Sequence, residues 1–178
     1  YDVIHKTRQI LPHEVPVTAK VRLGFDDKSL CCEIAQAVEA AQAQALIIHA
    51  RTKKEGYKPP AHWEYIAKMK RATKGIPIIA NGDIWTFQDF QQCKKVTGCH
   101  QFALGRSAFA NPFLALEIKQ ISQPPPWQTF MQKYLLHFFN QCNQNKNGHF
   151  AVSRLKQWTK FLPRQYPEAK TFFTTIKS

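Results

Sequence analysis

Four polar or glycine-rich clusters, each directly after a short apolar run, are the parts of this sequence that could do chemistry. They are Lys20-Val21-Arg22-Leu23-Gly24, His49-Ala50-Arg51, Asn81-Gly82-Asp83 and Gly105-Arg106. Gly105 would let an anion approach backbone N–H groups, and the guanidinium of Arg106 can hold phosphate oxygens with two hydrogen bonds. Gly82 likewise removes a side chain that would block close contact. The last two clusters therefore predict a phosphate site.

Lys20 lies in a run of apolar neighbours, so we expect a buried strand residue whose ammonium needs an anion. Reduced flavin carries negative charge near N1, and a lysine placed there would favour electron uptake. Each cluster also has a plainer interpretation: an ion pair with a carboxylate for Lys20, a cap facing a helix for His49, and a tight turn for Asn81-Gly82. Together, at regular spacing, the clusters favour a shared ligand.

The spacing indicates which elements position these clusters. The clusters recur every 24 to 32 residues, and a barrel of eight βα units has roughly 31 residues per unit. In such a barrel all strands run the same way, so side chains at their carboxyl ends converge on one rim. The fold class expected is therefore α/β with a parallel sheet of the TIM (β/α)8 type, although only four units are present.

Apolar periodicity locates the predicted elements. Short continuous apolar runs, typical of buried parallel strands, lie at residues 16–24, 45–49, 78–80 and 102–104. Helical spacing covers residues 29–42, 62–73 and 86–96, with Ser29 and Thr86 as expected caps, and a further helix is expected after Asn111-Pro112. Beyond these, helices are predicted at 129–141, 150–161 and 168–176.

A run of three prolines, Pro124 to Pro126, predicts a boundary between a partial barrel at residues 1–122 and a helical domain at 123–178. The net charge is +13, and from Lys119 onward nine Lys or Arg accompany a single acid, Glu168. Such a field attracts polyanions, although lysines that merely solubilise helices would give the same count. The aromatic residues of the predicted helical domain are at a spacing more typical of a core than of base stacking; they include Trp127, Phe138, Phe139 and Trp158.

Composition narrows the class of protein. Hydrophobic residues make up 44% of the 178 residues, enough for a core, and no apolar run is long enough to span a membrane. The five cysteines form neither C-x-x-C pairs nor a regular framework, so we expect reduced thiols in a cytoplasmic protein without a metal site. The chain begins without Met or a signal peptide, and we expect a segment of something longer.

The four clusters, in this order, resemble the flavin-dependent tRNA-dihydrouridine synthases. The matching segments are Ala19-Lys20-Val21-Arg22-Leu23-Gly24, His49-Ala50-Arg51-Thr52, Ile79-Ala80-Asn81-Gly82-Asp83-Ile84 and Leu104-Gly105-Arg106. Glu55-Gly56-Tyr57 and Ser153-Arg154-Leu155-Lys156-Gln157-Trp158 are similar to the bacterial DusC branch, which acts at position sixteen of the tRNA D loop. The resemblance covers essentially the whole chain, and it implies the carboxyl-terminal half of a TIM barrel, the last four βα units, followed by a small all-α domain.

The resemblance implies an enzyme that reduces the C5–C6 double bond of uridine with FMN, the flavin being reduced by NADPH or NADH. The residues implied to hold FMN are Lys20, His49, Asn81, Gly82, Asp83, Gly105 and Arg106. Those implied to meet tRNA are Tyr57, Arg154, Lys156 and Lys177, the last where the branch tends to carry arginine. The complete protein is expected to be monomeric.

The sequence departs from the family in one respect. The family's proton-donating cysteine lies in an Asn-x-x-Cys-Pro type segment, which nothing here matches, and we expect that cysteine upstream of Tyr1. Cys31 and Cys32 are predicted near a helix start and Cys93 within a helix, which is not the required rim loop. We therefore expect the isolated segment to be inactive or to depend on association.

Two other functions stay open on the sequence alone. One is a non-catalytic tRNA-binding module in which the flavin site is a relic. The other is a flavin-binding barrel enzyme that acts on a small molecule. A lysine, an Asn-Gly turn and a Gly-Arg phosphate-binding pair are not unique to enzymes that act on RNA. The basic tail, with its Arg154-x-Lys156-Gln157-Trp158 run, argues against the small-molecule enzyme.

Overall fold

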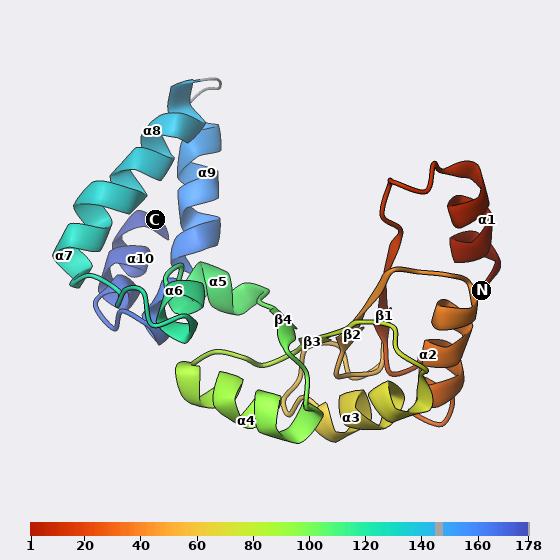
Figure 1. The fold of residues 1–178 in the computed structure, drawn as a ribbon. Coiled ribbons are helices and arrows are strands. Elements are labelled where there is room, and N and C mark those ends of the chain that lie inside the picture. The colour runs from red at the N-terminus through yellow and green to blue at the C-terminus, as the bar shows by residue number, and fades with distance from the viewer. Residues whose placement is uncertain (145–147, 178) are drawn as a thin grey trace. The chain divides into compact units, whose positions relative to one another are not determined.

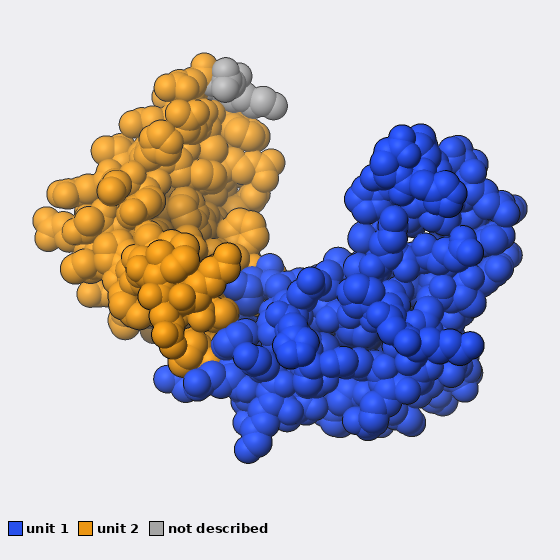
Figure 2. Space-filling view, viewed as in Figure 1, with its two compact units in different colours: residues 1–84, 88–104 blue, residues 85–87, 105–178 orange. Residues whose placement is uncertain are grey.

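The structure is a computed structural model, and it describes residues 1–144 and 148–177. The chain divides into two compact units (Figure 2). The first contains residues 1–84 and 88–104, and the second contains residues 85–87 and 105–178, of which 145–147 and 178 lie outside the described residues. Each unit has its own apolar core.

A four-stranded parallel sheet forms the centre of the first unit. Its strands are β1 (Thr18–Arg22), β2 (Ala45–His49), β3 (Ile78–Asn81) and β4 (Gln101–Ala103). They pair in sequence order, β1-β2-β3-β4, and every pair is parallel. This order confirms the predicted parallel α/β architecture and is consistent with a TIM-barrel-like domain.

Three helices cover one face of this sheet: α2 (Cys31–Ala40), α3 (Trp63–Ala72) and α4 (Phe87–Thr97) (Figure 1). Their buried residues, such as Ala35, Ile66 and Cys93, pack against Leu46 and Ala80 of the strands. Because side chains alternate along a strand, the residues next to these in sequence belong to the opposite face. The sheet therefore has one helix-covered face and one face without those helices.

A helix that the sequence did not predict begins the chain, α1 (Asp2–Ile10). Of its three apolar side chains, Val3 and Ile10 are exposed, and Ile4 packs half-buried against the core, so its apolar periodicity is weak. It is also held by Arg8, whose guanidinium is buried and donates to the carbonyls of Val15 (2.8 Å) and Leu11 (2.9 Å).

The described elements of the second unit are all helices. Its elements are α5 (Arg106–Ala110), α6 (Leu114–Ile118), α7 (Trp127–Phe130), the π-helix η1 (Met131–Leu135), α8 (Leu136–Gln144), α9 (Gly148–Thr159), the 3-10 helix η2 (Leu162–Arg164) and α10 (Ala169–Lys177). Phe130, Leu135 and Leu162 form the buried centre, with Trp127 and Trp158 packed around them. The expectation that the aromatics at positions 127 and 158 belong to a core is confirmed.

The units divide at a different place from the proline run. Residues 105–122 group with the helical unit because Phe113 packs edge-on against Tyr134, with ring centroids 5.2 Å apart, and because the indole N–H of Trp158 donates to the carbonyl of Phe109 at 2.9 Å. Residues 85–87 join the same unit through Trp85, which is contacted by Arg164. A proline run reflects only the local backbone, so it does not reveal contacts between residues far apart in the sequence.

One predicted cap is wrong. Helix α2 begins at Cys31 with Leu30 before it and has no side-chain cap, whereas Ser29 was expected to cap it. Asp27 accounts for the difference, because its carboxylate accepts from both the amide (2.8 Å) and the hydroxyl (2.5 Å) of Ser29. These bonds also lower the pKa of Asp27.

Among the described residues, no helix is long and apolar enough to cross a membrane.

Candidate functional site

The face of the sheet opposite the helices carries the polar clusters in register. One row across the four strands consists of Lys20, Ile47, Ile79 and Gln101, and the next row, at the carboxyl ends, consists of Arg22, His49, Asn81 and Ala103. Lys20 and Gln101 are exposed, while Ile47 and Ile79 are half-buried. Three of the clusters predicted from sequence therefore meet at one end of one face.

Lys20 is exposed, whereas the sequence predicted a buried ammonium. Its apolar neighbours Val17 and Ala19 are buried, and Ala19 belongs to the core beneath the helices. Lys20 belongs to the other face because side chains alternate. Apolar residues on either side of a strand position thus indicate that one face of the sheet is buried, but they do not indicate whether the opposite face is buried.

His49 lies at the end of β2 and is 6% exposed, and the turn at Gly82 packs closely against it. A Cβ on Gly82 would lie 3.4 Å from Cδ2 of His49 and 3.2 Å from Cβ of Ala61, and the φ of Gly82 is +127°. The absence of a side chain at Gly82 therefore allows close packing against His49. The carbonyl of Gly82 accepts the indole N–H of Trp63 at 2.7 Å, which fixes the turn.

Asp83 pairs with a fully buried arginine. Nη2 of Arg51 donates to Oδ2 of Asp83, and Nε of Arg51 donates to the carbonyl of Lys58 at 2.6 Å. Arg51 is 0% exposed. The carboxylate that the sequence assigned to a cofactor thus joins the loops after β2 and β3. Asn81 makes the corresponding link to β4, because its Nδ2 donates to the carbonyl of Ala103 at 2.7 Å.

Arg22 holds the loop that carries Tyr57. Its Nη1 donates to the carbonyls of Thr52 and Gly56, both at 2.8 Å, and its guanidinium lies 5.4 Å from the centre of the Tyr57 ring. The rings of Tyr57 and His49 have centroids 6.0 Å apart. Tyr57, 61% exposed, is therefore positioned over the same end of the sheet as His49.

Glu55 is the centre of a polar network in this loop. Its Oε1 accepts from Nζ of Lys28 at 2.6 Å and lies 2.9 Å from Nε2 of His62, and its Oε2 accepts the amide N–H of Thr52 at 2.7 Å. Burial alone raises the pKa of Glu55, but Lys28, Thr52 and His62 favour the anion and lower its pKa to about 2. Glu55 thus ties the loop to the segment before α2.

Gly105 and Arg106 belong to the second unit, where they begin α5. Apart from Gly105 and its two neighbours in the chain, no described residue has an atom within 4 Å of the position that a Cβ on Gly105 would take, so that space is open to an anion. The guanidinium of Arg106 lies 5.3 Å from the centre of the Trp85 ring, and that of Arg164 lies 4.0 Å from it. Trp85 therefore positions two guanidinium groups.

The three basic residues predicted to meet RNA lie on α9 and α10. Nζ of Lys156 donates to the carbonyl of Lys177 at 3.0 Å, so residues 21 apart in sequence are in contact. Arg154 is exposed, donates to Oε1 of Gln157 at 2.8 Å and stacks on Phe150, with Cζ 5.0 Å from the ring centre. Tyr57, the fourth predicted residue, belongs to the first unit.

Comparison with known proteins decides the family. Residues 1–172 match the Dihydrouridine synthase (Dus) family. The chain belongs to the dihydrouridine synthase family. It is 45% identical over 177 residues to the tRNA-dihydrouridine(16) synthase of Shewanella oneidensis, covering 99% of this chain and 56% of that protein. For the protein of the same name from Haemophilus influenzae the identity is 40% over 179 residues, covering 100% of this chain and 57% of the relative.

A third relative, the tRNA-dihydrouridine(16) synthase of Aquipseudomonas alcaligenes, is 38% identical over 179 residues, with 98% of this chain and 56% of the relative covered. These matches confirm the dihydrouridine synthase family and its DusC branch as the sequence predicted. The chain spans about half the length of the curated relatives it matches.

The cysteines of this dihydrouridine synthase chain are all free thiols. Cys31, Cys93 and Cys99 are buried in the core on the helix-covered face, and Cys32 packs against that core. Burial and the neighbouring Cys32 raise the pKa of Cys31, and burial and nearby Cys99 raise the pKa of Cys93 to about 12. These four thiols thus belong to the opposite side of the sheet from Lys20 and His49.

The structure adds Arg22, Arg51 and Trp85 to the residues that the sequence assigned. Arg22 and Arg51 were quoted only as parts of motifs, because both partners of Arg22 and the carboxylate partner of Arg51 lie 30 or more residues away. A signal was present for both, since an arginine next to a buried strand needs an acceptor. Trp85 follows Asn81-Gly82-Asp83-Ile84, and nothing in its spacing indicated stacking with two guanidinium groups.

Replacing Glu55 with glutamine is expected to reduce the free energy of unfolding at pH 7 by about 1 kcal/mol, because the neutral amide binds Lys28 and His62 less strongly. The contacts of Glu55 lower its pKa from 4.5, its ordinary value, to about 2 in the folded state. Its contribution is therefore complete above pH 4.5 and is lost as the pH falls towards 2. Urea unfolding followed by circular dichroism across this range measures it.

The matched control is Glu64→Gln, because the Glu64 side chain is 63% exposed and lies 3.5 Å from Nδ1 of His62. We expect it to have little effect at any pH. A difference between wild type and Glu55→Gln that stays constant from pH 7 to pH 2.5 would show that the network, rather than the charge of Glu55, is responsible.

Proposed function

We propose that this chain provides the flavin- and tRNA-binding part of an FMN-dependent tRNA-dihydrouridine synthase, which reduces a D-loop uridine to 5,6-dihydrouridine with NADPH or NADH. The observation that carries the proposal is the pair of rows on the sheet face opposite the helices. Lys20, His49 and Asn81 lie there on three adjacent strands near their carboxyl ends. In parallel barrels this is where ligands bind.

Within each unit, the proposed residues suit a part of the cofactor. Lys20 is exposed and can offer its ammonium to an electron-rich ring, and the space beside Gly105 is open to a phosphate that Arg106 would grip. His49, Asn81, Gly82 and Asp83 complete the proposed set, with Asp83 acting from its ion pair with Arg51. When bound, reduced FMN supplies a hydride for C6 of uracil, and NAD(P)H restores the reduced flavin.

In this proposal the chain's own groups bind and orient. Arg154, Lys156 and Lys177 would hold the tRNA backbone through the basic helical region, residues 123–178, and Tyr57 would meet the RNA beside His49. A stacked uridine cannot present C6 to a flavin, so one uridine must be extruded. The proton for C5 would come from a cysteine outside these residues, because no cysteine here lies in an Asn-x-x-Cys-Pro type segment and Cys31, Cys32, Cys93 and Cys99 belong to the helix-covered side.

The fold proposal follows from the same features. We infer that the four βα units are the last four of an eight-unit barrel and that residues 1–122 belong to it. The parallel order β1-β2-β3-β4 and relatives of nearly twice this length support this inference. The chain alone is then expected to bind ligands without completing turnover, and the complete protein to be a cytoplasmic monomer that uses no metal.

Replacing Lys20 with glutamine tests the flavin site. We expect FMN affinity, measured by quenching of flavin fluorescence on titration with the chain, to fall about tenfold, because a charged hydrogen-bond partner is lost. Lys20 is exposed, so the fold should not change. The matched control is Lys94→Gln on α4, an exposed lysine of the helix layer, which should bind FMN like the wild type.

A parallel titration with tRNA at low salt separates the two proposed roles. Binding of tRNA that weakens steeply with salt, together with FMN binding, supports the proposal. Binding of tRNA without FMN would identify a tRNA-binding module with a relic flavin site. Binding of neither would refute the proposed function.

A further inference from the structure

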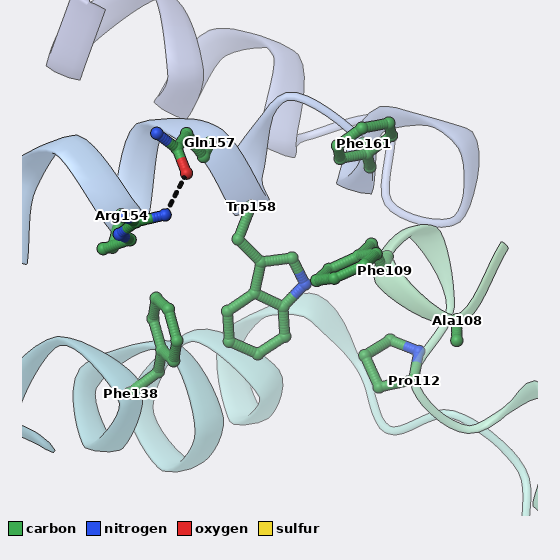
Figure 3. A pocket seen from close by; sticks show the side chains of 8 residues that line it. All are labelled: Ala108, Phe109, Pro112, Phe138, Arg154, Gln157, Trp158 and Phe161. Atoms are coloured by element: carbon green, nitrogen blue, oxygen red, sulfur yellow. Dashed lines mark hydrogen bonds between the residues drawn. The ribbon is translucent and has the colours of Figure 1, made fainter. Parts of the chain in front are cut away.

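The helical unit contains a pocket of about 470 Å³ whose apolar walls have no role in the proposed function (Figure 3). Its walls are largely aromatic, and two polar side chains of α9 lie at one side. The residues that matter here are Phe109, Phe138, Trp158, Phe161, Arg154 and Gln157. Pockets of roughly 300–1,000 Å³ with apolar walls and a few convergent polar groups are typical small-ligand sites.

The aromatic wall is fixed before any ligand binds. The indole N–H of Trp158 donates to the carbonyl of Phe109 at 2.9 Å, and its ring packs edge-on against Phe138 with centroids 4.8 Å apart. Phe109 in turn lies 5.9 Å from Phe161 between ring centroids. Because these contacts already hold the rings, a flat ligand would bind without the ordering of side chains that otherwise weakens association.

The polar side of the pocket is positively charged and can donate hydrogen bonds. Arg154 donates to Oε1 of Gln157 at 2.8 Å, so the amide nitrogen of Gln157 is the group that can donate to a ligand. Stacking of the Arg154 guanidinium on Phe150 orients it further. A ligand suited to this pocket has a flat ring with hydrogen-bond acceptors and a nearby negative charge.

We propose that this pocket takes one unstacked nucleobase of single-stranded RNA, with the adjoining phosphate at Arg154. The inference rests on the proposed function for its choice of RNA. Charge complementarity favours this occupant, because the segment from Lys119 onward carries nine basic residues and one acid. Aromatic rings beside a guanidinium are the combination with which proteins hold unpaired bases. The site is separate in the sequence from Lys20, His49 and Asn81.

The test compares oligouridine with an abasic ribose-phosphate oligomer of equal length and charge, by fluorescence anisotropy of labelled RNA and the whole chain. Stacking of one base contributes about 1–3 kcal/mol, so we expect at least about fivefold tighter binding of oligouridine. Ala108 lines the pocket and is exposed. Ala108→Phe should fill the pocket and abolish this preference, with an unchanged salt dependence.

The matched control is Ala115→Phe, since Ala115 is also exposed on a short helix of the same unit, α6. It should keep the wild-type preference. Gln157→Leu, at an exposed position of α9, is a second variant that should weaken the preference even if Ala108→Phe alters the fold. Equal oligouridine affinity in wild type, Ala108→Phe and Gln157→Leu would overturn the pocket proposal while tRNA binding stands.

Free nucleotide tests the pocket independently of RNA binding. Saturable quenching of tryptophan fluorescence by uridine monophosphate, absent in Ala108→Phe and absent with ribose 5-phosphate, would support the base pocket even if the chain bound no RNA. Equal quenching by ribose 5-phosphate, or no quenching by either compound, would overturn it. Failure of the pocket and failure of the proposed function are thus distinguished.

Discussion

Replacing Gly24 with alanine is expected to destabilise the first unit by about 4 kcal/mol. The new Cβ would stand 2.0 Å from the carbonyl oxygen of Asp27, a backbone atom that can move only with its chain, and the φ of Gly24 is +154°. The carbonyl of Gly24 also accepts the amide N–H of Lys53 at 2.9 Å. Urea unfolding followed by circular dichroism measures the loss.

Gly75→Ala is the matched control, because Gly75 has the same φ of +154° and no described atom within 4 Å of its Cβ position. It should lose only the conformational contribution, about 1–2 kcal/mol. The difference between the two variants isolates the steric clash at Asp27. Equal losses at the two positions would contradict this explanation and leave φ alone as the cause.

Arg51→Leu is expected to destabilise the same unit by about 3–5 kcal/mol, because it leaves the carboxylate of Asp83 and the carbonyl of Lys58 without the guanidinium they share. Arg51 is 0% exposed, so water cannot fully replace it. Thermal unfolding should shift downward by roughly 2–4 °C for each kcal/mol. The same loss should loosen the Asn81-Gly82-Asp83 turn and so weaken the proposed FMN binding.

An exposed ion pair provides the comparison. Lys54 lies 3.4 Å from Asp26, and their side chains are 74% and 65% exposed. Lys54→Leu should leave unfolding nearly unchanged, because water and salt screen this pair. If Arg51→Leu were as mild as Lys54→Leu, the buried pair would not be what joins the loops after β2 and β3.

The strands were predictable because a buried parallel strand is a continuous apolar run. The prediction for Ala45–His49 matches β2, and Ile78–Asn81 extends the predicted strand by one residue. Helix α1 was missed since two of its three apolar residues are exposed and a buried arginine helps to hold it. The contacts of Phe113 and Trp158 that group residues 105–122 with the helical unit join residues 21 to 49 positions apart, so sequence spacing could not indicate them.

The candidate site shows the same limit. Spacing alone grouped Lys20, His49 and Asn81, and the register confirms that they share one face. Spacing could not show that Lys20 is exposed, because coverage of a sheet face depends on where helices pack. Nor could it show the partners of Arg22, which are backbone carbonyls in a loop 30 residues further along the chain.

The uneven burial of the thiols has a practical consequence. Cys31, Cys93 and Cys99 are buried, whereas Cys32 and Cys142 are half-exposed, one in each unit. A protonated buried thiol reacts slowly with maleimides, so these dyes should attach first at Cys32 and Cys142. A donor and an acceptor placed there, without any engineered cysteine, would report by energy transfer on any relative movement of the two units when RNA is added.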